Sequence, residues 1–167
     1  EKKSAAPQGP AFLLQGLKPI GNTIIRTEEL APIYESSLGK QVTFADLENI
    51  VAKINKKYEQ KGYLTTNVFI PEQDIKDGIV EIRVVEGAMG NLSVDGNKWF
   101  PANFFEKYIH IKKKEPLNIK KLQSDILRLN KNPDTLVKTV ISAGKEPSSS
   151  DITLKIKDNF PWHVGFA

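Results

Sequence analysis

The chain has 167 residues, of which 40% are hydrophobic and 26% are charged, and its formal net charge is +4. These proportions are ordinary for a globular protein and argue against a disordered chain. Because the sequence contains no cysteine, disulfides, thiolate nucleophiles and zinc–thiolate sites are excluded.

The first part of the chain predicts a linker, a strand and two helices. Residues 1–11 are polar and contain two prolines, which favours a linker, whereas the apolar run 12–18 favours a short strand before a proline and a glycine. Residues 27–38 open with a threonine, as a capping hydroxyl, and two glutamates, which predicts a helix that stops at a glycine. Residues 43–61 predict a second helix, since a threonine followed three residues later by an aspartate resembles a capping box.

Two strands are predicted after the second helix, because the apolar period changes to two. Over residues 64–70 alternate side chains face opposite ways, as in a half-buried strand. Residues 71–78 form a polar connection, and apolar residues alternate again over 80–84. The predicted order of this unit is therefore strand, helix, helix, strand, strand.

The second half of the chain repeats the first at a nearly constant offset. Gly21-Asn22 recurs 75 residues later as Gly96-Asn97, and the helix start Thr43–Leu47 recurs at the same offset as Asn118–Leu122. The alternating segment 80–84 is matched 72 residues later. A chain built twice from one small unit is more typical of an array that presents surface than of a cavity that performs chemistry.

The elements of the second unit follow the same order. Residues 90–94 predict a strand, and a proline at a position where it is tolerated opens a helix within residues 101–109. A second helix, capped by an asparagine, is predicted over 118–129. The segments 136–141 and 152–156 then predict a hairpin joined by a loop that contains glycine.

These patterns predict an α+β protein with two tandem units, residues 12–87 and residues 88–158. Each unit has the order β-α-α-β-β, with a three-stranded sheet and two helices on one face of it. In each unit the helices precede a meander of strands, which is typical of the α+β class. Each unit is close to the lower size at which burial alone stabilises a domain.

The sequence offers no catalytic or metal-binding arrangement. His110 and His163 lie in different regions, and no serine stands in the setting of a nucleophile elbow. Asp74, Asp77 and Glu81 lie near a turn but lack a glycine-centred calcium loop, and no glycine-rich phosphate loop opens a helix. We therefore expect no enzymatic activity, no cofactor and no bound metal.

Two groups of lysines, within residues 53–61 and 112–121, are the candidates for a basic surface. They could contact phosphates, but no aromatic residues are interleaved to stack bases, and glutamates dilute the charge. A solvated helix face is the favoured interpretation, with a membrane surface or a protein partner as the functional alternative. We expect no nucleic-acid partner.

The open edges of the small sheets are the stronger functional candidates. Such an edge carries a row of unpaired N–H and C=O groups, to which an extended polypeptide can add as a further strand. Residues 64–70 are almost free of charge, which protects a merely structural edge poorly. The alternative is that a neighbouring domain covers this edge.

Four short motifs occur in order in the first unit: Tyr58-x-x-x-Gly62-Tyr63, Pro71-x-Gln73, Asp77-Gly78 and Val84-x-Glu86-Gly87. As a set, they resemble the periplasmic polypeptide-transport-associated (POTRA) domains of two-partner secretion outer-membrane transporters. The resemblance covers about residues 12–160 and is looser in the second unit.

The resemblance implies that both units are POTRA-like and that a transmembrane β-barrel follows them. Residues 159–167 are then the start of a truncated barrel strand, because large side chains alternate with small ones around a tryptophan. It also implies a position at the periplasmic face of the Gram-negative outer membrane and no use of nucleotide. We expect a monomer that is adjacent to its own barrel.

The implied function is to bind the amino-terminal secretion region of an unfolded exoprotein and to deliver it to the barrel. Our mechanistic hypothesis is strand addition along one of two edges, and we predict that proline at Val68 weakens client binding while the fold persists. The residues of the first edge are Leu64, Thr65, Thr66, Asn67, Val68, Phe69 and Ile70. Those of the second are Leu136, Val137, Lys138, Thr139, Val140 and Ile141.

Two other functions remain open from the sequence. One is a POTRA array of the general outer-membrane protein assembly machinery, whose clients are β-barrels. The other is a basic nucleic-acid-binding module, which would retain affinity for DNA or RNA at physiological salt.

Overall fold

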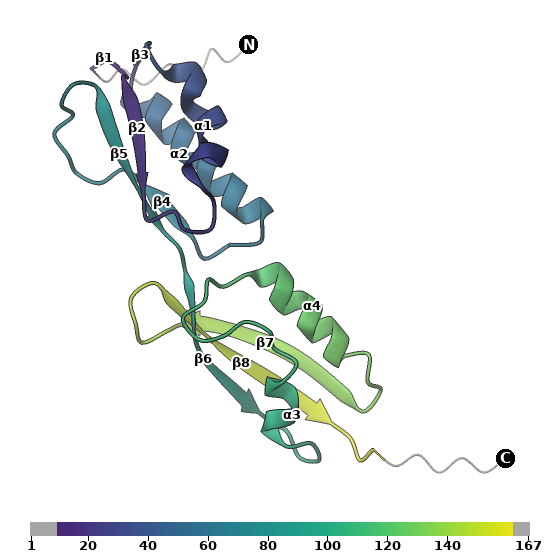
Figure 1. Cartoon of the computed structure of the whole chain (residues 1–167). Helices are drawn as coiled ribbons and strands as arrows, with labels where there is room; N and C mark the ends of the chain where they lie inside the picture. Colours follow the sequence, from purple (N-terminus) through teal and green to yellow (C-terminus); the bar gives the residue numbers. More distant parts are fainter. Residues whose placement is uncertain (1–9, 162–167) are drawn as a thin grey trace, which may run out of the picture. The chain divides into compact units, whose positions relative to one another are not determined.

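The computed structural model describes residues 10–161, which form two units (Figure 1). Unit 1 comprises residues 10–60 and 66–86, and unit 2 comprises residues 61–65 and 87–161. Most of the predicted linker, at residues 1–9, and of the predicted barrel strand, at residues 162–167, lies outside the described residues.

Unit 1 is a three-stranded sheet whose face is covered by two helices (Figure 1). The strand order is β2-β5-β4, with β2 parallel to β5 and β4 antiparallel to it, while β1 and β3 form a separate antiparallel pair. Its elements are β1 (Phe12–Leu13), β2 (Gly16–Ile20), α1 (Thr27–Tyr34), β3 (Gln41–Val42), α2 (Phe44–Gln60), β4 (Asn67–Phe69) and β5 (Ile79–Val85).

Unit 2 has the same plan. Its strand order is β6-β8-β7, with β6 parallel to β8 and β7 antiparallel to it. Its elements are β6 (Ala88–Asp95), α3 (Ala102–Glu106), α4 (Ile119–Leu129), β7 (Thr135–Ala143) and β8 (Ser149–Asp158). The predicted α+β class and the order β-α-α-β-β are confirmed. The predicted meander is wrong, because in each unit the last strand lies between the other two and pairs in parallel with the first.

The helix termini agree with the sequence prediction at two of three positions. Asp46 accepts hydrogen bonds from the Thr43 N–H and hydroxyl, both at 2.8 Å, as predicted at the start of α2. Asn118 Oδ1 accepts from the Lys121 N–H at 3.1 Å and caps α4. The prediction for Thr27 is wrong: Arg26 is the N-cap and makes no side-chain cap. Helix α1 also ends at Tyr34, with a 3₁₀ turn (Glu35–Ser37) after it.

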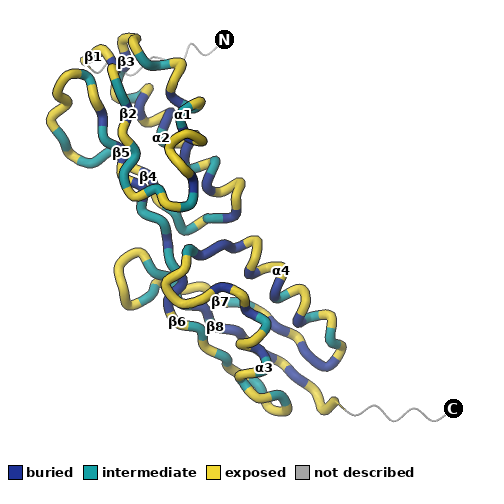
Figure 2. Tube along the Cα trace, in the orientation of Figure 1, coloured by how far each residue is buried: buried dark blue, intermediate teal, exposed yellow. Residues whose placement is uncertain are grey.

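Each unit has its own apolar core between the helices and the sheet. In α2, Leu47, Ile50, Ile54 and Tyr58 are buried and recur at helical spacing. Figure 2 shows buried residues recurring along α4 and β8 of unit 2 as well, and along β8 they alternate with less buried ones. The core of unit 2 includes Met89, Phe105, Leu117, Leu122, Leu129, Val137, Ile152, Leu154 and Ile156.

The repeated Gly-Asn pairs have the same structural role in both units. Gly21 and Gly96 have φ angles of 90° and 88°, in the left-handed region that favours glycine. A Cβ atom on either glycine would lie only 2.4 or 2.5 Å from the carbonyl oxygen of Val84 or Ile156. The sequence repeat therefore reflects a turn that passes directly over the central strand.

A carboxylate at the end of the central strand holds that turn in unit 1. Glu86 Oε1 accepts hydrogen bonds from the N–H groups of Thr23 and Ile24, both at 2.8 Å, and from the Tyr58 hydroxyl at 2.9 Å. Burial and the hydrogen bond to the Glu86 carboxylate raise the pKa of Tyr58. Tyr58 and Glu86, which belong to two different sequence motifs, are thus part of one hydrogen-bond network that holds the turn.

Asp158 is the counterpart of Glu86 in unit 2. Its carboxylate accepts hydrogen bonds from the N–H groups of Lys98, Trp99 and Phe100 at 2.8–3.1 Å. Burial raises the pKa of the Asp158 carboxyl, but these backbone donors outweigh burial and bring the pKa below its ordinary value.

Candidate functional site

Strands β4 and β7 are each an edge strand of their sheet: β4 lies within the predicted docking segment 64–70, and β7 contains the predicted segment 136–141. Along an antiparallel edge strand, residues alternate between pairing with the neighbouring strand and pointing both backbone groups outward. The outward groups alone are accessible to an added strand, so they decide what each edge can bind.

The edge of unit 1 is closed by a side chain. Asn55 of α2 accepts a hydrogen bond from the Val68 N–H at 3.0 Å and donates one to the Val68 carbonyl at 3.2 Å. Both backbone groups of Val68 therefore point away from β5, and Asn67 and Phe69 point toward it. Since β4 has only three residues, its one outward position is already occupied.

The predicted strand over residues 64–70 is therefore too long. Leu64 and Thr65 lie in a turn, and only Asn67, Val68 and Phe69 form the strand. The hydroxyls of Thr65 and Thr66 are buried and have no hydrogen-bond partner among the described residues. Neither threonine belongs to a strand edge.

A second side-chain amide completes the sheet of unit 1 where β4 stops. Gln73 donates to the Glu81 carbonyl and accepts from the Glu81 N–H, each at 2.8 Å. In the register of β4 and β5, Glu81 is the next residue of β5 that faces the β4 side. Gln73, from the Pro71-x-Gln73 motif, thus takes the place of a strand residue.

The edge of unit 2 is closed at one position and open further along. Asn130, just after α4, accepts from the Val137 N–H at 2.7 Å and donates to the Val137 carbonyl at 3.0 Å. Because β7 pairs with β8 without a register shift, Thr139 and Ile141 point outward like Val137. Among the described residues, nothing donates to or accepts from these outward groups of Thr139 and Ile141.

An apolar groove runs beside this open stretch of β7. Its volume is about 420 Å³, and no charged side chain lines it. Two of its residues, Leu127 and Ile141, are apolar yet 66% and 43% exposed. The lining residues are Ile119, Leu122, Gln123, Ile126, Leu127, Thr139 and Ile141.

Unit 1 has a matching groove between α2 and β4. It measures about 380 Å³ and contains exposed Phe44 and Phe69, but Glu48 and the clamping Asn55 also line it. It offers apolar contacts beside a strand with no open backbone position.

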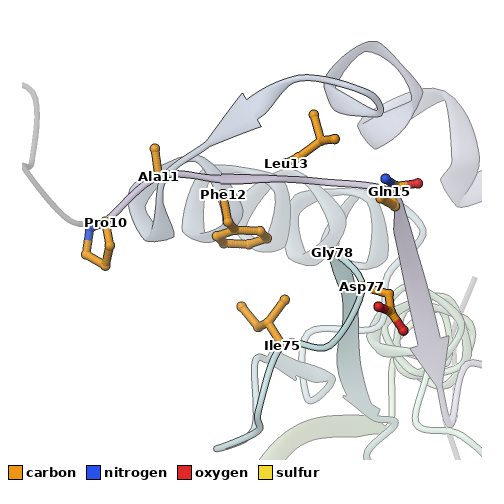
Figure 3. A pocket seen from close by; sticks show the side chains of 8 residues that line it. All are labelled: Pro10, Ala11, Phe12, Leu13, Gln15, Ile75, Asp77 and Gly78. Atoms are coloured by element: carbon orange, nitrogen blue, oxygen red, sulfur yellow. The ribbon is translucent and has the colours of Figure 1, made fainter.

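Unit 1 also contains a second hollow, of about 570 Å³, which was not predicted from the sequence (Figure 3). Figure 3 shows the Phe12 and Ile75 side chains pointing toward each other, with Gln15 and Asp77 further along. The hollow forms where β1 meets the connection before β5. These two segments are far apart in the chain, and no sequence motif indicates that they are in contact.

His110, one of the two histidines, has a structural partner in Asp125. Asp125 is buried and accepts from the His110 N–H at 2.9 Å, while its other oxygen lies 2.8 Å from His110 Nδ1. His163 lies outside the described residues. Over residues 10–161, no three histidine or acidic side chains gather as metal ligands would, and no helix is both long and apolar enough to cross a bilayer.

Comparison with known proteins finds a family model that matches the first unit and several similar proteins. Residues 12–87 match the family model described as "POTRA domain, ShlB-type". The heme/hemopexin transporter protein HuxB of Haemophilus influenzae is 26% identical over 155 residues, which cover 90% of this chain and 27% of HuxB. The outer membrane transporter CdiB of Dickeya dadantii is 22% identical over 170 residues, which cover 98% of this chain and 29% of CdiB.

Solved structures have the same fold. CdiB from Escherichia coli superimposes with a TM-score of 0.84 at 22% identity, over 96% of this chain and 30% of CdiB. The N-terminal domain of Omp85 from Thermosynechococcus elongatus superimposes with a TM-score of 0.75 at 23% identity, over 89% of this chain and 67% of that domain. The chain thus spans less than a third of the length of its transporter relatives.

Proposed function

We propose that the chain is the periplasmic recognition segment of a two-partner secretion outer-membrane transporter, because residues 12–87 match the family model described as "POTRA domain, ShlB-type". Its client is an unfolded exoprotein, whose amino-terminal secretion region it binds and delivers to the transporter's β-barrel. Homology to HuxB and CdiB supports this proposal, because both are described as transporters.

The open stretch of the β7 edge is the observation that carries the binding proposal. Thr139 and Ile141 together offer two N–H donors and two C=O acceptors. An extended client can pair with these groups whatever its sequence, because they belong to the backbone. The apolar groove between α4 and β7 then receives alternate side chains of the client and provides some selectivity.

The edge of unit 1 has a different role in this proposal. With Val68 tied to Asn55, β4 has no position left for an added strand. Its groove, with exposed Phe44 and Phe69, is left to contact client side chains only. In this proposal the client-binding strand is therefore β7, and Thr139 rather than Val68 is the position where proline should weaken binding.

The test uses purified chain and the amino-terminal fragment of the exoprotein encoded beside the transporter gene. We expect Thr139→Pro to weaken binding about tenfold, because proline removes one outward donor and its ring obstructs the neighbouring strand. Thr139→Ala is the matched control: it keeps the N–H and should bind like the native chain. Full binding by a correctly folded Thr139→Pro protein would exclude the β7 edge.

A role in the general assembly of outer-membrane proteins is the second candidate, because the N-terminal domain of an Omp85 protein has the same fold. The two functions differ in client. An assembly module should bind unfolded β-barrel precursors, whereas a two-partner secretion module should prefer the secretion region of its exoprotein. Competition between these two fragments for one chain distinguishes them.

A further inference from the structure

We propose that the side-chain amide of Asn130 is a register stop on the β7 edge, which confines an added strand to the stretch from Thr139 onward. The inference rests on the proposed strand addition and specifies where along β7 that addition takes place. It concerns a residue that lies outside the predicted docking segment, just after the end of α4.

The amide of Asn130 occupies the position that a strand residue would fill. It offers one acceptor and one donor in a fixed plane, and it satisfies the N–H and the C=O of Val137 together, at 2.7 and 3.0 Å. The backbone of Asn130 is itself held, because its N–H donates to the Ile126 carbonyl at 2.9 Å. A client strand that reached Val137 would have to displace this clamp.

The outward position before Val137 is obstructed as well. The Thr135 N–H donates to the Asn132 carbonyl at 3.2 Å, and the Thr135 hydroxyl donates to the Leu129 carbonyl at 2.9 Å. Blocked positions thus occupy the start of β7, and the open ones, Thr139, Ile141 and Ala143, lie toward its hairpin end. The boundary between them is Val137.

The same clamp recurs in unit 1, which argues that it is a device of this fold. Asn55 and Asn130 are 75 residues apart, the offset of the sequence repeat, and each holds the edge strand of its own unit. In unit 1 the clamp covers the whole outward edge of β4. In unit 2 it covers only one position of a longer strand, so it divides that edge instead of closing it.

The consequence for the client is a short and defined contact. Client side chains that share the face of Thr139 and Ile141 lie over the apolar groove, so apolar residues at alternate positions fit best. Because only three residues of β7, namely Thr139, Ile141 and Ala143, offer free outward backbone groups, the contact is short and reversible, as transport of a client requires.

The experiment uses disulfide cross-linking, for which the chain is suited because it has no native cysteine. Leu136→Cys and Val140→Cys place single thiols on either side of the proposed boundary. Their native side chains are 48% and 47% exposed, so the two thiols should react alike with a small reagent. The probe is a short synthetic peptide of alternating valine and threonine with one central cysteine. Adjacent strand positions, roughly 5 Å apart, are within disulfide reach.

We expect the peptide to cross-link to Val140→Cys and hardly to Leu136→Cys. Adding Asn130→Ala should raise the Leu136→Cys yield about tenfold, since one more residue of β7 can then pair. Asn130→Asp should raise the Leu136→Cys yield by a smaller factor, since a carboxylate still accepts from the Val137 N–H but cannot donate to its carbonyl. This second variant keeps the test usable if Asn130→Ala does not fold, as judged by circular dichroism. Asn55→Ala is the matched control and should leave both yields unchanged.

Two outcomes would overturn the inference, and they are distinguishable. Equal cross-linking at Leu136→Cys and Val140→Cys with Asn130 in place would exclude a register stop while supporting strand addition. Absence of cross-linking at both positions, in native and Asn130→Ala backgrounds alike, would overturn strand addition on β7 and the register stop with it.

Discussion

The edge strands of the two units differ strongly in length. Each strand is clamped by an asparagine, Asn55 within α2 or Asn130 just after α4, but β4 has three residues and β7 has nine. One amide can satisfy only one outward residue. The same device therefore closes the short edge completely and leaves the long edge partly open.

The difference in strand length follows from the connections to the central strands. In unit 2, β7 continues almost to the loop at residues 144–148 and pairs with β8 along its whole length. In unit 1 a longer connection, residues 70–78, follows β4, and Gln73 supplies the hydrogen bonds that a longer strand would have made. The number of open outward positions on each edge thus depends on a connection rather than on the core.

The largest expected effect is on stability, and it tests whether the glycine turn is equally important in both units. Gly96→Ala and Gly21→Ala should each destabilise their own unit by about 3 kcal/mol or more, because both glycines have positive φ and the added Cβ would contact a carbonyl oxygen. Hydrogen exchange of peptides from each unit measures the two effects separately. Gly39→Ala is the control, since that glycine also has positive φ but has nothing within 4 Å of the added atom. If only one of the two substitutions destabilised its unit, the two glycine turns would not be equivalent.

A smaller effect is expected at Asp158, and it should depend on pH. Asp158→Asn should cost unit 2 about 2 kcal/mol at neutral pH, because an amide cannot accept from all three N–H groups as the carboxylate does. The lowered pKa means that this stabilisation is present above the unfolded-state pKa of about 4 and is lost as pH falls through the folded-state value.

The measurement is chemical denaturation followed by Trp99 fluorescence in a Trp162→Phe background. The native and Asp158→Asn proteins should converge in stability as the solution becomes acidic. A difference between them that stays constant down to strongly acidic pH would show that the Asp158 charge does not brace the turn.

The smallest effect concerns the caps of the two second helices. Asn118→Ala and Thr43→Ala should each lower the free energy of unfolding by about 1 kcal/mol, as loss of a helix cap does. Ser124→Ala, on the exposed side of α4, is the control and should change little. Urea denaturation measures the free energy of unfolding of each variant. A loss no larger than that of Ser124→Ala would show that the cap does not stabilise its helix.

The repeat made much of this fold predictable. Gly21-Asn22 and Gly96-Asn97 marked the same turn in both units, and the Thr43 and Asn118 caps were evident from local spacing. The prediction failed where contacts are long-range. The alternation of residues 64–70 suggested a full strand, because nothing local shows that Leu64 and Thr65 lie in a turn. The parallel pairing of β2 with β5 was likewise missed, because it joins residues that are far apart in the sequence, such as Gly16 and Ile79.

The clamps were missed although the sequence contains a signal for them. Asn55 and Asn130 occur at the offset of the repeat, and Asn55 lies inside a helix, where asparagine is not a favoured residue. A polar residue kept at matching places in both copies indicates a contact that both copies need. Asn55 meets Val68 thirteen residues later, and Asn130 meets Val137 seven residues later.

The reliance on asparagine side chains also makes this protein sensitive to chemical ageing. Asparagine is one of the less durable residues, and its hydrolysis leaves an aspartate. At position 130 the new negative charge would face the Val137 carbonyl and release it, without removing any atom of the backbone. We therefore expect aged preparations to bind an extended peptide over a longer stretch of β7, while their helices and core stay intact.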